Sequence, residues 1–241
     1  MDFIMIPNLP NYIVWIFALT TLWTLILFAN TIRKSDSIRT KKMGIPTVII
    51  ALIWLGVQAI LTLKGVYNTH TRYFPPKLVL FGIFPAIATI VLTMVTNGGR
   101  RFVDSLPLRN ITWISIVRLP VELVLYWLFL YKAVPELMTF EGRNWDIISG
   151  VTTPIIILMA FRKVKTKTVL LLIWNIVCLG LLLNIVINAM LSAPFLFQKF
   201  AFDQPNIAII NFPFSWLPTF IVPIVLFGHL VSIRRLTSSK K

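Results

Sequence analysis

The chain has 241 residues, of which 57% are hydrophobic and only 13% are charged, and its net charge is +15. A soluble globular domain carries about 25% charged residues, so this composition excludes an ordinary water-soluble fold. The charges are gathered in short runs between long apolar segments, as in a polytopic membrane protein, because a helix needs about 20 mostly apolar residues to cross a bilayer. The basic excess is typical of cytoplasmic loops, and we expect no nucleic-acid partner.

The apolar segments predict an all-α bundle of seven transmembrane helices in a single domain that covers residues 1–241. The first segment follows MDFIMIPNLP, which has no basic residues, and precedes RKSDSIRTKK. It is therefore expected to be a retained anchor and not a cleaved signal peptide. In chain order the predicted spans are 11–32, 44–66, 77–97, 111–132, 144–161, 169–191 and 213–233.

The distribution of basic residues predicts the orientation of this bundle. Of the 23 Lys and Arg residues, sixteen lie in the loops after the first, third and fifth spans and in the C-terminal tail, whereas six lie on the other side. Cytoplasmic loops are enriched in Lys and Arg. The sequence therefore predicts an N-terminus outside, a cytoplasmic C-terminus and a multi-pass protein of the plasma membrane, which is the inner membrane in bacteria.

Prolines recur in or near the predicted spans, and each mid-helix proline leaves one backbone carbonyl without its helical partner. Membrane helices tolerate such prolines where neighbouring groups satisfy the carbonyl. The bends could simply shape the bundle, or they could open a central cavity. The prolines concerned are Pro46, Pro85, Pro120, Pro154, Pro218 and Pro223.

The fourth predicted span, ITWISIVRLPVELVLYWLFLYK, contains an arginine and a glutamate near mid-membrane. Arg118 and Glu122 are four residues apart and share one helix face, so they could pair with each other. A single charge at the bilayer centre costs about 2.5–3.5 kcal/mol on insertion scales. This face is therefore expected to point into the bundle.

Two polar sites are expected from the depths of the other polar residues. An inner site would combine Arg118 and Glu122 with Asn175 and His229, which lie at similar depths on the sixth and seventh spans. An outer site would draw on the outer halves of the spans and on the outer loops. Its candidate members are Gln58, Asp146, Asn184, Asn188, Glu136, Glu141 and Asp203.

An ionisable residue within the membrane suggests a functional site by default, and three interpretations are open. Arg118 and Glu122 could be a structural clamp, or Glu122 could be the proton- or ligand-responsive group of a small-solute transporter or membrane sensor. Alternatively, Glu136, Glu141 or Asp146 could serve as acid or base in a membrane enzyme that acts on a lipid or isoprenoid at the outer face. A structural or accessory subunit of a membrane complex is a further alternative. The expected partners are the bilayer and a small-molecule ligand or lipid, and the sequence does not identify any protein partner.

No cofactor or metal site is expected. The two histidines, His70 and His229, would lie near opposite membrane faces, so they cannot share a haem or an iron cluster. The single cysteine, Cys178, excludes an internal disulfide. Phosphate-binding loops, intramembrane-protease motifs and paired-aspartate motifs are absent from the sequence.

Several stretches of the C-terminal half resemble an uncharacterised family of bacterial multi-pass membrane proteins. They are RLPVELVLYWLFLYKAVPELMTFEGRNWDIISG, LLIWNIVCLGLLLNIVINAMLSAPFLF and QKFAFDQPNIAI. The resemblance implies a bacterial inner membrane and no particular activity. The number of spans also resembles the outline of the rhodopsins, but the last span, FSWLPTFIVPIVLFGHLVSI, lacks the lysine that a retinal protein requires.

Overall fold

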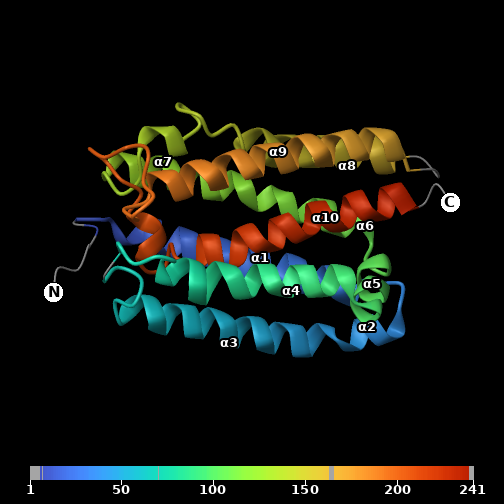
Figure 1. The fold of residues 1–241 in the computed structure, drawn as a ribbon. Coiled ribbons are helices and arrows are strands. Elements are labelled where there is room, and N and C mark those ends of the chain that lie inside the picture. The colour runs from blue at the N-terminus through green and yellow to red at the C-terminus, as the bar shows by residue number, and fades with distance from the viewer. Residues whose placement is uncertain (1–5, 7, 70, 163–165, 239–241) are drawn as a thin grey trace.

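The computed structural model describes residues 6, 8–69, 71–162 and 166–238, and within them the regular structure is helical (Figure 1). The α-helices are α1 (Asn11–Arg33), α2 (Ile38–Lys42), α3 (Gly44–Leu63), α4 (Phe84–Val95), α5 (Asn97–Asp104), α6 (Leu108–Ile114), α7 (Arg118–Leu130), α8 (Ile147–Phe161), α9 (Thr168–Ser192) and α10 (Val222–Ser238). Two π-helical turns, η1 (Val79–Ile83) and η5 (Leu217–Ile221), precede α4 and α10, and three 3-10 turns are η2 (Ser115–Val117), η3 (Glu136–Met138) and η4 (Ala208–Ile210).

Five helical segments in the described part of the chain are long and apolar enough to cross a membrane. They are Asn11–Arg33, Gly44–Leu63, Leu108–Leu130, Thr168–Ser192 and Leu217–Ser238. A sixth crossing is possible if η1 and α4 are counted together with α5, from which they are bent by 86°. The remaining segment, α8, has 15 residues and is shorter than the other candidates.

The structure differs from the sequence prediction after the third span and at the start of the fifth. Residues 97–104 form the helix α5, where a loop was expected, because Thr96 caps it by accepting a hydrogen bond from the backbone nitrogen of Gly99. The fifth segment begins at Ile147 and not at residue 144, and Asp146 occupies its N-cap position. This later start makes α8 short, and Asp146 at its N-terminal end is buried in the bundle.

The helices run side by side, and the connections after α1, α4 and α8 gather with the C-terminus at one end (Figure 1). We call this the basic end, and its described Lys and Arg residues are Arg33, Lys34, Arg39, Lys41, Lys42, Arg100, Arg101, Arg109, Arg162, Lys167, Arg234 and Arg235. Four further basic residues counted in the prediction, Lys163, Lys165, Lys240 and Lys241, lie outside the described residues, as does His70.

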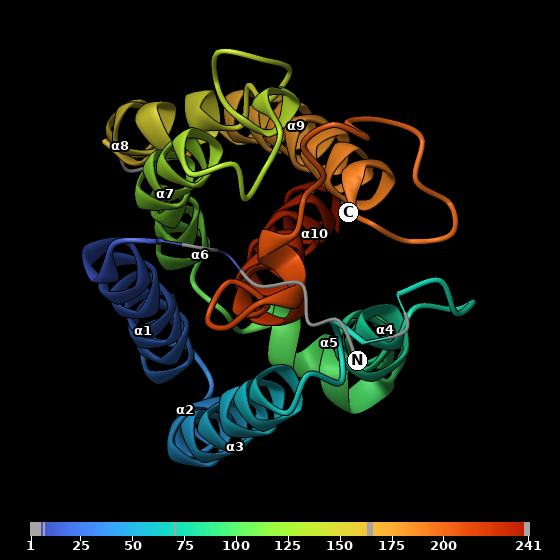
Figure 2. The same cartoon turned by 90° about the vertical axis from the view of Figure 1, so that its left-hand side faces the viewer.

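The central element of the bundle is the segment formed by η5 and α10. In the apolar stretch of this segment, 61% of the residues are buried, compared with 17% in α3, the least buried of the five candidate spans. Viewed along the helices, α10 lies in the middle of a ring formed by the other helices (Figure 2). Ile221 of η5 and Ile224 and Val225 of α10 belong to the largest apolar cluster, together with Phe17 of α1 and Val121 of α7. Side chains on α10 therefore reach most of the other helices.

Two of the prolines explain how α3 attaches to the rest of the bundle. Pro85 and Pro223 have no amide hydrogen, so the carbonyls four residues earlier, those of Phe81 and Thr219, lose their usual helical donors. Gln58 Nε2 donates a hydrogen bond to the carbonyl oxygen of Phe81 at 3.2 Å. One helical turn earlier on α3, Trp54 Nε1 donates to the carbonyl oxygen of Thr219 at 3.0 Å. Both π-helical turns, η1 and η5, are thus bound by side chains of α3.

Candidate functional site

A network of buried polar side chains is centred on Arg118, the first residue of α7. Arg118 is 2% exposed, and its Nη1 lies 2.8 Å from Oδ1 of Asp146, which is 4% exposed. Nη1 is also 3.4 Å from the carbonyl oxygen of Cys178 on α9. Because neither charge can reach solvent, each one neutralises the other within the bundle. The pair joins α7 to the N-terminal end of α8.

The second branch of the network fixes the tautomer of His229. Arg118 Nη2 lies 3.0 Å from His229 Nε2, and since a guanidinium group can only donate, Nε2 must accept. His229 Nδ1 therefore carries the proton and donates to Oδ1 of Asn175 at 2.9 Å. Asn175 Nδ2 in turn donates to the carbonyl oxygen of Leu171 at 2.8 Å. This branch connects α7, α10 and α9, and each residue in it donates a hydrogen bond to the next, from Arg118 to the carbonyl oxygen of Leu171.

Glu122 has a different partner from the one expected. Its Oε2 accepts a hydrogen bond of 2.5 Å from Nδ2 of Asn144, which also donates to the carbonyl oxygen of Met138. Asn144 Oδ1 accepts from the backbone nitrogen of Asp146 at 3.0 Å. The expected Arg118–Glu122 ion pair is therefore replaced by an Arg118–Asp146 pair. Asp146, at the N-cap of α8, lies beside the guanidinium group where Glu122 was expected.

A glycine permits the close approach of α7 and α8 beside this pair. A Cβ atom added to Gly150 would lie 2.9 Å from the backbone nitrogen of Leu119, a distance that side chains do not adopt. Gly150 is one helical turn after Asp146, and Leu119 follows Arg118. The absence of a side chain at residue 150 thus positions Asp146 against Arg118.

The inner site predicted from the sequence is therefore assembled in part. Arg118, Asn175 and His229 are in one chain of hydrogen bonds, and Asp146, which was assigned to the outer site, belongs with them. Asn144 was considered only as a helix cap, yet it links Glu122 to the backbone beside Asp146. The arrangement uses both nitrogens of His229, and it connects four helices, as a structural clamp does.

The other predicted outer residues do not form one site. Asn184 donates to the carbonyl oxygen of Arg143, and Asn188 donates to Asn184. The remaining three, Glu136, Glu141 and Asp203, are exposed in the connections between helices.

Gln58 takes part in a separate contact at the same end of the bundle. Its Oε1 accepts a hydrogen bond of 2.6 Å from the hydroxyl group of Tyr67, in the turn after α3. Tyr67 is 2% exposed, and this burial raises the pKa of its phenol to about 12. The Gln58–Tyr67 contact therefore holds the turn against α3 with a protonated phenol.

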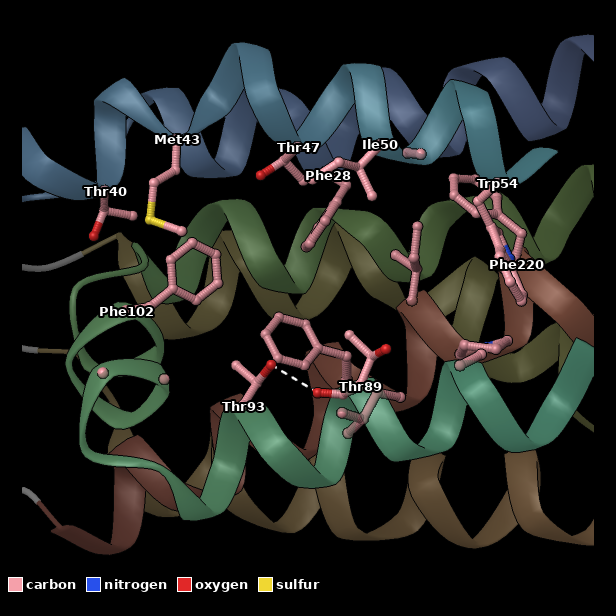
Figure 3. Close-up of a pocket in the computed structure, with 18 of the residues that line it drawn as sticks. Phe28, Thr40, Met43, Thr47, Ile50, Trp54, Thr89, Thr93, Phe102 and Phe220 are labelled. Atoms are coloured by element: carbon pink, nitrogen blue, oxygen red, sulfur yellow. Dashed lines mark hydrogen bonds between the residues drawn. The ribbon is translucent and has the colours of Figure 1, made fainter. Parts of the chain in front are cut away.

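A cavity of about 730 Å³ lies elsewhere, among α3, α4, α5 and α10 (Figure 3). Its volume is within the roughly 300–1,000 Å³ that is typical of small-molecule sites. The residues that line it are mainly apolar, and they come from six α-helices, from η5 and from the residues that flank α2. They are Phe28, Ser37, Arg39, Thr40, Met43, Thr47, Ile50, Ala51, Trp54, Pro85, Ala86, Thr89, Ile90, Thr93, Gly98, Gly99, Arg101, Phe102, Thr219, Phe220, Pro223, Ile224 and Phe227.

The threonines on the α4 wall contribute little polarity to the cavity. Thr89 and Thr93 donate their hydroxyl hydrogens to the carbonyl oxygens one turn earlier, at 2.8 and 2.7 Å, and the second of these bonds is drawn in Figure 3. On the opposite wall, Thr47, Ile50 and Trp54 lie along α3, and Met43 directly precedes this helix (Figure 3). The walls are therefore suited to hydrocarbon.

The two ends of the cavity differ in chemistry. Arg39 of α2 and Arg101 of α5 line it at the basic end, while Trp54 and Phe220 line it toward the middle of the bundle. Ile50 is 67% exposed and Met43 is 44% exposed, so the cavity also opens sideways along α3.

Sequence reasoning did not find the cavity. Two features of the sequence are related to it: Pro85 and Pro223, because proline bends could open a central cavity, and the basic loops at one end. These signals do not reveal that α3 and α4 stand apart over several turns. That separation depends on how the helices pack.

The chain belongs to the family described as a domain of unknown function, DUF8737, whose model matches residues 75–237. The match contains every residue of the Arg118 network and the α4, α5 and α10 walls of the cavity, whereas α1, α2 and α3 precede it. Comparison with curated proteins gave no match. Comparison with solved structures also gave none.

Proposed function

We propose that the chain is an integral membrane protein with seven crossings, an outer N-terminus and a basic end in the cytoplasm of a bacterial cell. The five long apolar helices and the bent α4–α5 pair support the membrane location. The gathering of basic residues at one end supports the orientation, because cytoplasmic loops are rich in Lys and Arg. The short helix α8 would be the seventh crossing, with Asp146 inside the hydrophobic layer at its outer end.

In this setting the protein binds a lipid-like amphiphile, as a membrane sensor or a transport protein does. The cavity of about 730 Å³ carries the proposal, because its walls are apolar and one end is basic. The distance from Met43 to Trp54 along α3 is about 16 Å at about 1.5 Å per residue, close to half of the roughly 30 Å hydrocarbon layer. The cavity would therefore extend through one leaflet, the length that one acyl chain requires.

The Arg118 network supports this function indirectly, as a clamp. It holds α7, α8, α9 and α10 together on the opposite side of α10 from the α3 and α4 walls (Figure 2). A rigid half of the bundle would leave the loosely packed α3 side to accommodate a ligand. The alternative of a membrane enzyme has less support, since Glu136 and Glu141 are exposed and Asp146 is paired with Arg118.

Photolabelling would test amphiphile binding. The purified full-length chain in detergent would be irradiated with a 16-carbon fatty acid that carries a diazirine on its chain, and the labelled peptides would be identified by mass spectrometry. We expect adducts concentrated on α3, α4 and α10 residues of the cavity. Ala86→Trp, which fills the cavity, should remove them, whereas Ile173→Trp on the exposed face of α9 should not.

Two outcomes would refute the proposal. In the first, the adducts would be spread evenly over all exposed apolar faces. In the second, labelling of the cavity residues would persist in the Ala86→Trp variant. The Ile173→Trp variant carries the same new side chain, so it separates filling of the cavity from a general effect of tryptophan.

A further inference from the structure

The two arginines at the basic end of the cavity, Arg39 and Arg101, form no ion pair with an acidic residue in the part of the chain that the structure describes. In the described residues, the ion pairs between side chains are Arg118–Asp146 and Arg234–Asp104. Arg101 donates from Nε to the carbonyl oxygen of Asn97 at 3.3 Å, a contact that leaves its charge uncompensated. Arg39 and Arg101 belong to different helices, and both line the same mainly apolar cavity.

From this arrangement we infer that the occupant is an anionic phospholipid of the cytoplasmic leaflet, with its phosphate between Arg39 and Arg101 and one acyl chain in the cavity. The inference rests on the proposed function and adds the chemical class of the ligand. A guanidinium group binds a phosphate through paired hydrogen bonds, and it remains charged near the membrane surface.

The sideways opening explains why a lipid with two chains would fit. Ile50 of α3 and Met43 before it line the cavity and are also exposed at the surface of the bundle, so the second acyl chain would remain in the bilayer. Inside the cavity, the first chain would run from the arginines toward Trp54 and Phe220. A free phosphate ion would use only the arginines and would leave the apolar walls uncovered.

A matched pair of double variants tests the role of the two arginines. Arg39→Gln with Arg101→Gln removes both charges that line the cavity. Lys42→Gln with Arg100→Gln removes two charges from the same two helices, at residues that do not line it. Both double variants lower the net charge by two. A general attraction between the basic end and anionic lipid would therefore weaken equally in both.

The measurement is native mass spectrometry of the full-length protein in detergent with dioleoyl phosphatidylglycerol or dioleoyl phosphatidylcholine. We expect the wild type to retain the anionic lipid preferentially. Each basic residue near a membrane surface contributes a factor of about 5 in affinity for anionic lipid, so loss of both arginines should reduce the preference by about 25-fold. The Lys42→Gln and Arg100→Gln variant should keep the preference, and thermal unfolding would verify that both double variants are folded.

Other results would overturn the inference in distinguishable ways. Equal retention of the two lipids, still blocked by Ala86→Trp, would refute the anionic headgroup and leave the amphiphile site intact. Lipid retention that Ala86→Trp does not change would refute the proposed function itself. Equal loss of preference in the two double variants would show surface attraction only. Displacement of the bound lipid by millimolar inorganic phosphate would identify the ion, and not the lipid, as the ligand.

Discussion

Trp54 on α3 donates its indole hydrogen to the carbonyl oxygen of Thr219, the carbonyl that Pro223 leaves without a helical donor. The two residues are 165 positions apart, and both line the cavity. One turn later, Gln58 makes the equivalent contact with the carbonyl of Phe81, four residues before Pro85. α3, the least buried candidate span, is thus attached to the central segment at a carbonyl that has lost its helical hydrogen bond to a proline. This contact closes the end of the cavity that is farther from the arginines.

Replacement of Trp54 by Phe should weaken this attachment while it keeps most of the apolar contact. A hydrogen bond contributes about 1 kcal/mol to stability, and an unsatisfied carbonyl in hydrocarbon adds to the loss. We expect the free energy of unfolding in mixed detergent micelles to fall by about 1–2 kcal/mol. Trp15→Phe is the control, since Trp15 is 67% exposed on α1. Equal losses in both variants would contradict a specific role for the Trp54–Thr219 bond.

The approach of η1 to η5 depends on Gly82. A Cβ atom at this position would lie 2.5 Å from Cγ2 of Thr219 and 3.2 Å from Oε1 of Gln58. Gly82→Ala should therefore destabilise the protein by about 1–3 kcal/mol, as overpacking does. Gly180→Ala on α9 has no atom within 4 Å of the new methyl group, so it should be neutral or stabilise the helix by up to about 1 kcal/mol. Thermal unfolding of the two variants would distinguish these signs.

Depth along the predicted spans was enough to bring Arg118, Asn175 and His229 together, because helix rise fixes how far each residue lies from a membrane face. The same arithmetic placed Asp146 at the outer mouth, because it treated the start of the fifth span as lying at the membrane face. The partner of Arg118 depended on where α8 starts, and that start is fixed by the packing of the preceding connection, in which Asn144 bonds to Glu122 and Met138.

The fold shows the same division between local and tertiary information. Hydrophobic run length was sufficient to locate the helix from Gly44 to Leu63 and the other long apolar helices, because each buries its own backbone hydrogen bonds. Run length did not reveal that α5 is bent by 86° from α4, because the only local sign of the new helix is its N-cap residue, Thr96. The space between α3 and α4 depends on helices that are far apart in sequence, and no local pattern records it.

Removal of one charge of the Arg118–Asp146 pair should lower the free energy of unfolding more than replacement of both residues by apolar ones. Asp146→Asn leaves a buried guanidinium group without its counter-charge, so we expect the free energy of unfolding to fall by about 3–5 kcal/mol. Asp203→Asn, at an exposed carboxylate, should change it by less than about 0.5 kcal/mol. The double variant Arg118→Met with Asp146→Leu should be more stable than Asp146→Asn, because it removes both buried charges. If the double variant were the less stable, the pair would contribute more than mutual neutralisation.

Glu122 distinguishes a clamp from a charge-dependent site. Glu122→Gln keeps an oxygen that can accept the hydrogen bond from Asn144 Nδ2, so we expect a loss of less than about 1 kcal/mol. Glu122→Leu leaves that buried donor with the Met138 carbonyl alone and should cost about 1–3 kcal/mol. Unfolding measurements on both variants would test this order. A loss with Gln as large as that with Leu would show that the negative charge itself is required, in agreement with a proton- or ligand-responsive Glu122.

Tyr67 predicts a dependence of stability on alkaline pH. Its pKa is raised by burial to about 12, from a usual value near 10, so the folded protein keeps the phenol proton that the unfolded chain loses. The free energy of unfolding should therefore be insensitive to this group below pH 10 and should fall as the pH rises from about 10 toward 12. Tyr67→Phe should remove that part of the slope, whereas Tyr12→Phe, at a residue that is 48% exposed, should retain it. Unfolding measured at several pH values in this range would contradict the argument if the slope were the same for all three proteins.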